Sequence, residues 1–297
     1  MSHLHRIVPI AVLLVATLTP AAARTPPPQT PTTEELLKAA GTYLDAYATK
    51  ISGTTLDELF ILIELSGPNM QVPQRLYSDL VLLKIDVAGH LLGVRDPYAV
   101  DKKKLRAHDP RVTDALEHPT LASWAAVQGY GRENAIYLRA NGVIWFSDPM
   151  TALDFISKPN QPRMTYKVEG SKKINGVQVY GVGFKESERP DTTYLLGTPD
   201  HARGSGRVWI DPATGAIHDT ELWVDSETET ARVHVAYTME PTRSVLLPHE
   251  ADGTFDERER GSKSIASGVN TKVGFEAHLT YSNPRYTPID LTHIIAR

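Results

Sequence analysis

The chain of 297 residues contains no cysteine. This absence excludes a disulfide framework, a thiolate metal site, a cysteine nucleophile and the acylated cysteine that anchors bacterial lipoproteins. The folded state must therefore be stabilised by the burial of apolar side chains, for which the chain is long enough.

Long hydrophobic runs are also missing. The longest, Ile7–Leu18, has about 12 residues, whereas a membrane-spanning helix needs about 20. It follows Arg6 and precedes Ala21–Ala23, and this order of basic, apolar and small residues is typical of an export signal. We therefore expect residues 1–23 to be a signal peptide that is removed. The mature protein would be periplasmic or secreted, with no stable membrane span.

Positive charge is not in excess. The chain has 31 Lys and Arg against 35 Asp and Glu, a formal net charge of -4. It lacks the basic surface that nucleic acids require, and we expect no nucleic-acid partner. The one basic cluster, residues 102–106, is typical of a solvated hairpin tip.

No catalytic motif stands out. Gly204-Ser205-Gly206 lacks the spacing of a nucleophile elbow, phosphate-binding glycine patterns are missing, and no two histidines after residue 23 lie within five positions of each other. We therefore expect no enzyme activity, no catalytic residues, no metal and no cofactor. A zinc or acid–base site is the alternative, formed by His234 and His278 with Glu221 and Glu276 on the polar faces of neighbouring strands.

The first residues after the signal are rich in proline and threonine, so residues 24–31 are interpreted as an extended tether. Thr32 and Glu35 then form a capping-box pattern, and apolar residues recur at helical spacing as far as Ile51. This pattern predicts a helix with one apolar face. Asp109-Pro110 and Asp148-Pro149 each predict the start of a short helix, and residues 120–138 predict another.

The rest of the chain is rich in strand patterns, with short connections that favour antiparallel pairing. We expect strands in residues 59–65, 76–85, 91–100, 164–168, 180–184, 206–239 and 275–281. Residues 252–270, rich in charge and glycine, are interpreted as a loop. The fold class is therefore α+β, a large curved antiparallel sheet with helices covering its concave face, in a single domain over residues 32–297. Two domains are the alternative.

Large apolar side chains in these strands share one face. We expect them to converge on the concave side of the sheet, where they either form a packed core or line a cavity for a hydrophobic ligand. The candidate ligand-binding residues are Tyr166, Tyr180, Phe184, Val235, Tyr237, Phe275, Leu279 and Tyr281.

One hairpin pattern resembles a known family. Val208-Trp-Ile-Asp-Pro-Ala-Thr-Gly215, followed by Thr220-Glu-Leu222, looks like the periplasmic lipoprotein-carrier (Lol-like) half-barrel superfamily. Residues 163–283 are similar to it in layout, and the N-terminal third resembles an uncharacterised exported bacterial family. The resemblance implies an unclosed half-barrel whose open side is plugged by helices, with lipid or lipoprotein bound in the concavity.

These observations predict an exported, non-catalytic carrier that binds a lipid or another hydrophobic small molecule in the concavity of a half-barrel. The alternative is an envelope sensor or protein-interaction module with a fully packed sheet. Its partner would be another envelope protein, engaged through the loops expected at residues 185–204 and 252–270.

Overall fold

The chain divides into two compact units, Met1–Thr30 and Pro31–Arg297. The computed structural model describes residues 30–65, 73–84, 90–118, 120–133, 148–187, 203–225, 229–257 and 273–289. The first unit contributes only Thr30 to these ranges, so the expected signal peptide and nearly all of the tether lie outside the described residues. The fold below is that of the second unit.

The first helix begins where the capping box predicted. In α1, Thr33–Ile51, the Glu35 backbone N–H donates to Thr32 Oγ1, while the Glu35 carboxylate accepts from the Thr32 backbone N–H. The buried side includes the predicted stripe, which consists of Leu36, Ala40, Leu44, Tyr47 and Ile51. This stripe packs into the main apolar core and brings the helix against β2, β5 and β10.

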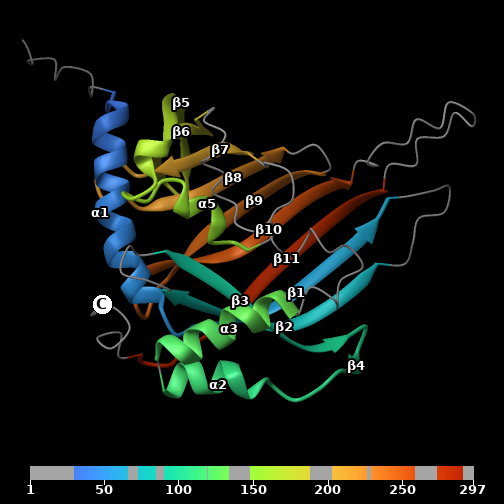
Figure 1. Ribbon diagram of the computed structural model, residues 1–297. Coiled ribbons are helices and arrows are strands. Elements are labelled where there is room, and N and C mark those ends of the chain that lie inside the picture. The colour runs from blue at the N-terminus through green and yellow to red at the C-terminus, as the bar shows by residue number, and fades with distance from the viewer. Residues whose placement is uncertain are drawn as a thin grey trace, which may run out of the picture. The chain divides into compact units, whose positions relative to one another are not determined.

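The strands form one eleven-stranded antiparallel sheet in the order β4-β3-β2-β1-β11-β10-β9-β8-β7-β6-β5 (Figure 1). The first group of strands is β1 Thr54–Glu64, β2 Gln74–Lys84, β3 Leu91–Val100 and β4 Lys103–Lys104. The second group is β5 Met164–Ile174, β6 Val177–Glu186, β7 Arg203–Ile210, β8 Ile217–Asp225, β9 Glu229–Glu240, β10 Val245–Glu257 and β11 Val273–Tyr286. The chain meanders within each group, and the pairing of β1 with β11 joins the two. The sheet is unclosed, as a half-barrel requires, because β4 and β5 are its two ends.

Two predictions about this sheet were wrong. Residues 252–257, predicted as the start of a loop, continue β10 and pair with both β9 and β11. The strand was missed here because most of these residues are polar or charged. Of residues 252–256, only Gly253 and Phe255 face inward, so the apolar half of the alternation is weak. The second is the expectation that the large apolar side chains of the strands share one buried face, because Met239 of β9 is 50% exposed. Of the two expected loops, residues 188–202 and 258–272 lie outside the described part of the chain.

The remaining helices are short. Helix α2, Pro110–Glu117, is capped by Asp109 as predicted, and α3 spans Leu121–Glu133. The predicted helix at Asp148 begins later than expected, as α5, Thr151–Asp154, followed by the 3-10 turn η2, Gln161–Arg163. Residues 134–147, including the end of the helix predicted at 120–138, lie outside the described residues.

The helices are divided between the two faces of the sheet. In β2, Leu80 and Leu82 join the main core with α1, whereas Val81 and Leu83 join a second cluster with α2 and α3. Successive strand residues point to opposite faces, so α2 and α3 pack on the outer face of β2 and β3. Of the described helices, only α1 and α5 contribute to the core on the inner face.

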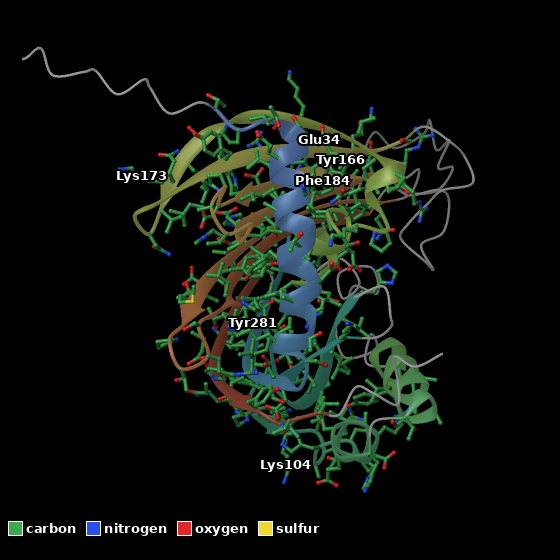
Figure 2. All side chains as sticks on the ribbon, turned by 90° about the vertical axis from the view of Figure 1, so that its left-hand side faces the viewer. Glu34, Lys104, Tyr166, Lys173, Phe184 and Tyr281 are labelled. Carbon is green, nitrogen blue, oxygen red and sulfur yellow. The ribbon has the colours of Figure 1, made fainter. Side chains whose placement is uncertain are left out.

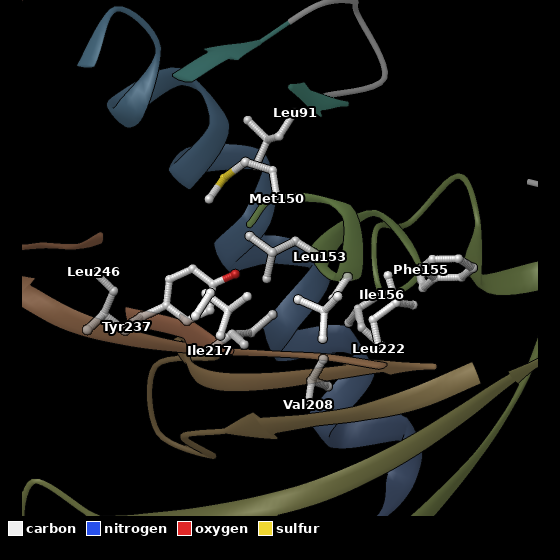
Figure 3. Packing of buried hydrophobic residues seen from close by; sticks show 14 of the residues in the cluster. Leu91, Met150, Leu153, Phe155, Ile156, Val208, Ile217, Leu222, Tyr237 and Leu246 are labelled. Carbon is white, nitrogen blue, oxygen red and sulfur yellow. The ribbon is translucent and has the colours of Figure 1, made fainter. Parts of the chain in front are cut away.

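The main core lies between α1, α5 and the inner face of the sheet. Figure 3 shows Met150, Leu153 and Ile156 packed above Ile217 and Leu222 of β8. All five are buried. The segment Asp148–Asn160, called the α5 segment below, therefore contributes its apolar side chains to the interior, and it also contacts β3 and β7.

The turn between β7 and β8 fixes one end of this core. Gly215 has a φ of +75°, the left-handed conformation that its place in the hairpin pattern predicted. A Cβ atom there would lie 2.2 Å from the backbone oxygen of Ala39 in α1. Glycine is thus needed both for the turn and for the close approach of the turn to the helix.

Candidate functional site

The predicted ligand-binding residues all belong to the apolar inner face. Six are buried core residues, namely Phe184, Val235, Tyr237, Phe275, Leu279 and Tyr281, while Tyr166 and Tyr180 are partly buried against the same core. Figure 2 shows Tyr166, Phe184 and Tyr281 spread along the length of α1, from its beginning toward its end. The structure therefore brings these eight residues onto one surface but distributes them along it.

Three of the eight contact the α5 segment directly. The Tyr166 hydroxyl donates to the Phe155 backbone oxygen at 2.6 Å, and the Tyr237 hydroxyl donates to the Pro149 backbone oxygen at 2.5 Å. The ring of Phe184 stacks on that of Phe155, with centroids 5.1 Å apart. The α5 segment thus occupies the space in front of these aromatic residues.

A buried ion pair lies on the same inner face. Arg95 Nε of β3 donates to both carboxylate oxygens of Glu58 of β1, at 2.9 and 2.8 Å, and Ser78 of β2 donates to the same carboxylate at 2.6 Å. The arginine side chain is 4% exposed and the glutamate 0%. Because an unpaired charge is costly to bury, the pair holds three neighbouring strands in one register.

Asp148 lies close to this ion pair at the start of the α5 segment. Its carboxylate accepts hydrogen bonds from the backbone N–H groups of Gly93 and Met150, at 3.0 and 2.9 Å. Burial raises the pKa of Asp148 to about 6, an effect that these two bonds and Arg95 oppose. Asp148 therefore ties the α5 segment to β3 and titrates between mildly acidic and neutral pH.

Two tyrosine hydroxyls in the interior have no hydrogen-bond partner among the described residues. They belong to Tyr47 of α1 and Tyr281 of β11, which are each 3% exposed. Burial raises the pKa of both, and Tyr237 is near enough that its ionisation would raise them further. An unpaired buried hydroxyl is energetically unfavourable, and both are available as donors to a polar group that enters the core.

The strand ends away from α1 border a hollow of about 660 Å³, called the strand-end hollow, and its lining includes Trp223, Arg232 and Thr254 of the outer face. The inner-face residues Val224, Ala231 and Phe275 line it, together with Leu65, which is 48% exposed. Polar side chains, including Asp225, Arg232 and Asp256, complete the lining. An apolar surface and a charged border thus meet at one opening.

The histidines considered for a metal or acid–base site lie on the opposite, outer face. His234 Nε2 is 3.1 Å from Asp219 Oδ2, and His278 Nδ1 is 2.6 Å from Asp252 Oδ1. Asp252 of β10 is paired in register with His234 of β9 and with His278 of β11. Within the described ranges, no group of three or more His, Asp or Glu side chains is arranged to hold a metal ion.

Sequence reasoning missed the Glu58–Arg95 pair, Asp148 and the strand-end hollow. One signal for the pair was present, because Glu58 falls in phase with the inward-facing residues Leu56, Phe60 and Leu62. A charged residue in phase with a buried face indicates a buried partner. The partner itself depends on the pairing of β1, β2 and β3.

Among known protein families, sequences and structures, several crystal structures are similar to the chain. No family model and no curated protein sequence matches the chain. The chain is similar to the crystal structure of a protein domain described as outer membrane lipoprotein-sorting, from Vibrio parahaemolyticus, at 12% identity over 89% of this chain and 97% of that chain, with a TM-score of 0.39.

Two further crystal structures are similar to it. One is of a DUF1329 family protein from Desulfovibrio piger, at 9% identity over 89% of this chain and 98% of that chain, with a TM-score of 0.35. The other is of a LolA superfamily protein from Nitrosomonas europaea, at 9% identity over 88% and 96% of the two chains, with a TM-score of 0.31.

Proposed function

We propose that the protein is an exported, non-catalytic carrier that binds a lipid or another hydrophobic small molecule in the concavity of its half-barrel. In this proposal α1 and the α5 segment cover the concave face, and the ligand enters through the strand-end hollow. The observation that carries the proposal is that the apolar inner face reaches that hollow, where the buried Val224, Ala231 and Phe275 lie beside the exposed Leu65.

The size and lining of the hollow support this function. Its volume of about 660 Å³ falls within the range of roughly 300–1,000 Å³ that is usual for small-molecule sites. Each methylene group that moves from water to an apolar surface gains about 0.8 kcal/mol. An acyl chain would make this gain, without any catalytic group, for each methylene that it buries against Leu65 and against Val224, Ala231 and Phe275, which an entering ligand must uncover further.

The interior has polar groups suited to the head of such a ligand. The unpaired hydroxyls of Tyr47 and Tyr281 both donate hydrogen bonds, and the carboxyl or ester oxygens of a lipid accept them. To reach them, a ligand must displace part of the α5 segment, which is held by the hydrogen bonds from Tyr166 and Tyr237. We therefore assign the ligand's chain to the strand-end hollow and its deeper part to the space that α5 now fills.

Export is part of the proposal. The pattern of residues 1–23 supports a signal peptide, and residues 24–31 would be the tether of the mature protein. None of the helices in the described part of the chain combines the length and the hydropathy needed to cross a bilayer. If no lipid is bound, the alternative partner is another envelope protein.

A binding assay tests the proposal. The purified, delipidated protein is titrated with 11-(dansylamino)undecanoic acid, whose fluorescence rises in an apolar site. We expect saturable binding that Leu65→Asp weakens by about tenfold, because a charge at the opening opposes apolar contact. Leu105→Asp is the matched control, since Leu105 is also exposed, at 37%, and lies after β4. No saturable binding, or equal loss in both variants, would contradict the proposal.

A further inference from the structure

The outer face of the sheet carries a hollow of its own. It lies over β8, β9, β10 and β11 and has a volume of about 520 Å³. We call it the outer-face hollow. Its lining includes Trp223, the large aromatic residue that β8 leaves 38% exposed. An exposed tryptophan ring beside a cluster of polar side chains is not needed for the packing of the inner core.

The lining side chains lie in two adjacent rows that run across the strands, because the strands pair in a fixed register. In one row, Glu221, His234, Asp252 and His278 stand opposite one another in turn across four strands. In the next row, the same is true of Trp223, Arg232, Thr254 and Glu276. Residues of neighbouring strands in such rows lie about 5 Å apart. The rows therefore form a continuous surface of one aromatic ring and seven polar side chains.

We propose that the outer-face hollow is a binding site for a neutral saccharide. One face of a pyranose ring presents C–H groups, which pack on the negative face of an aromatic ring such as that of Trp223. The rim of the sugar presents hydroxyls that both donate and accept hydrogen bonds. The hollow matches this rim, because Glu221, Asp252 and Glu276 accept, whereas Arg232 donates.

Charge at the hollow excludes the two simpler alternatives. An anionic ligand would face the carboxylates of Glu221, Asp252 and Glu276. Against them stand Arg232 and two histidines, His234 and His278, which already lie beside Asp219 and Asp252. A cationic ligand that stacked on Trp223 would meet Arg232, which stands directly opposite it on the next strand. A neutral ligand with many hydroxyls avoids both repulsions.

Two of the charged side chains that line the outer-face hollow are not engaged in ion pairs. Arg232 and Glu276 form no ion pair with any other residue in the described part of the chain. They stand on either side of Thr254, in the same row as Trp223. A bound sugar would therefore find donors and acceptors that are not already committed to the protein.

The test uses the complete mature protein and four neutral probes, namely cellohexaose, laminarihexaose, maltohexaose and hexa-N-acetylchitohexaose. Binding is measured by isothermal titration calorimetry and by saturation-transfer NMR. We expect at least one probe to bind, Trp223→Ala to weaken it by at least about tenfold, and Asp252→Ala to weaken it as well. Trp223→Phe should retain part of the affinity because it keeps an aromatic face.

Two controls separate this site from the interior one. Thr280→Ala changes an exposed residue two positions from His278 on the same face of β11 and should leave saccharide affinity unchanged. Leu65→Asp should also leave it unchanged, because Leu65 lines only the strand-end hollow, whereas Trp223, Arg232 and Thr254 line both hollows. If no probe binds at millimolar concentration, or if Trp223→Ala binds as tightly as the wild type, the proposal is overturned. Either result leaves the lipid assay unaffected.

Discussion

Arg95 of β3 and Glu58 of β1 form a charged pair that crosses the intervening strand inside the half-barrel. Arg95 Nε lies 2.9 and 2.8 Å from the two glutamate oxygens, and Ser78 of β2 donates to the same carboxylate from between them. Glu58 is on the inner face with Leu56 and Phe60, so the pair lies within the apolar core, with Asp148 as a nearby buried carboxyl group. Removing one partner leaves a buried charge without compensation.

The first prediction concerns this pair. Arg95→Met should lower the free energy of unfolding by about 3–5 kcal/mol, because Glu58 remains buried without its partner. The double variant Glu58→Leu/Arg95→Met should recover most of that loss, since neither partner of the pair is then left as an uncompensated buried charge. Urea denaturation followed by circular dichroism measures both. Additive losses in the double variant would show that the two side chains act independently.

The second prediction concerns pH. The pKa of Asp148 is raised by burial from 3.8 to about 6. Between about pH 4 and 6 the unfolded chain has released this proton while the folded protein retains it, so Asp148 makes the folded state less stable as pH rises. Asp148→Asn removes this dependence. Its free energy of unfolding, relative to wild type, should increase by about 2.4 kcal/mol from pH 4 to pH 7.

Asp57→Asn is the control for that measurement. Partial burial acts to raise the pKa of Asp57, but hydrogen bonds from Asn283 and Arg285 outweigh it and lower the pKa below 3.8. Asp57 therefore stabilises the folded state above its unfolded pKa, and this contribution is lost as pH falls. The stability of Asp57→Asn relative to wild type should decrease as pH rises. Parallel curves for the two variants would contradict the assignment.

The third prediction compares two glycines that both have a positive φ. Gly176, at +83°, has no atom within 4 Å of the position that a Cβ would take, so Gly176→Ala should cost only about 1–2 kcal/mol of backbone strain. Gly215→Ala would add a clash with Ala39 of α1. It should cost at least about 1 kcal/mol more, because the turn or the helix must move. Equal unfolding midpoints in urea would show that the turn does not press on α1.

The fourth prediction tests the start of α1. Thr32→Ala removes the side-chain acceptor for the Glu35 backbone N–H and should cost about 1 kcal/mol of stability. Thr42→Ala is the control inside the same helix. The Thr42 hydroxyl donates to the Lys38 backbone oxygen, and alanine has the higher helix propensity, so this change should be neutral or slightly stabilising. A loss at Thr42 as large as that at Thr32 would exclude the capping explanation.

Local patterns predicted much of this fold. The capping box at Thr32, the proline after Asp109 and the turn at Gly215 are properties of a few adjacent residues, and the structure confirms all three. The antiparallel meander also follows from short connections between alternating segments. Where charge dominated the alternation, as in residues 252–257 of β10, the strand was missed.

What the sequence could not predict depends on residues far apart in the chain. The Glu58–Arg95 pair requires the registers of two strand pairs, and alternation specifies the face of a residue but not its neighbours. The Asp148-Pro149 pattern predicted a helix start but not the position of the α5 segment inside the half-barrel. Alternation also puts Met239 in phase with the inner face, but its side chain is 50% exposed although its partner Leu246 on β10 is buried. Both hollows arise from this long-range assembly.

The proposed carrier function is tested most sharply by native mass spectrometry of the mature protein purified from an envelope fraction, with the composition of any bound molecule determined after its release. A carrier should hold a lipid or another apolar molecule at one per chain, and Leu65→Asp should lose it whereas Leu105→Asp should keep it. A protein that emerges free of ligand, and that also fails to take up the dansylated fatty acid, would contradict the carrier function.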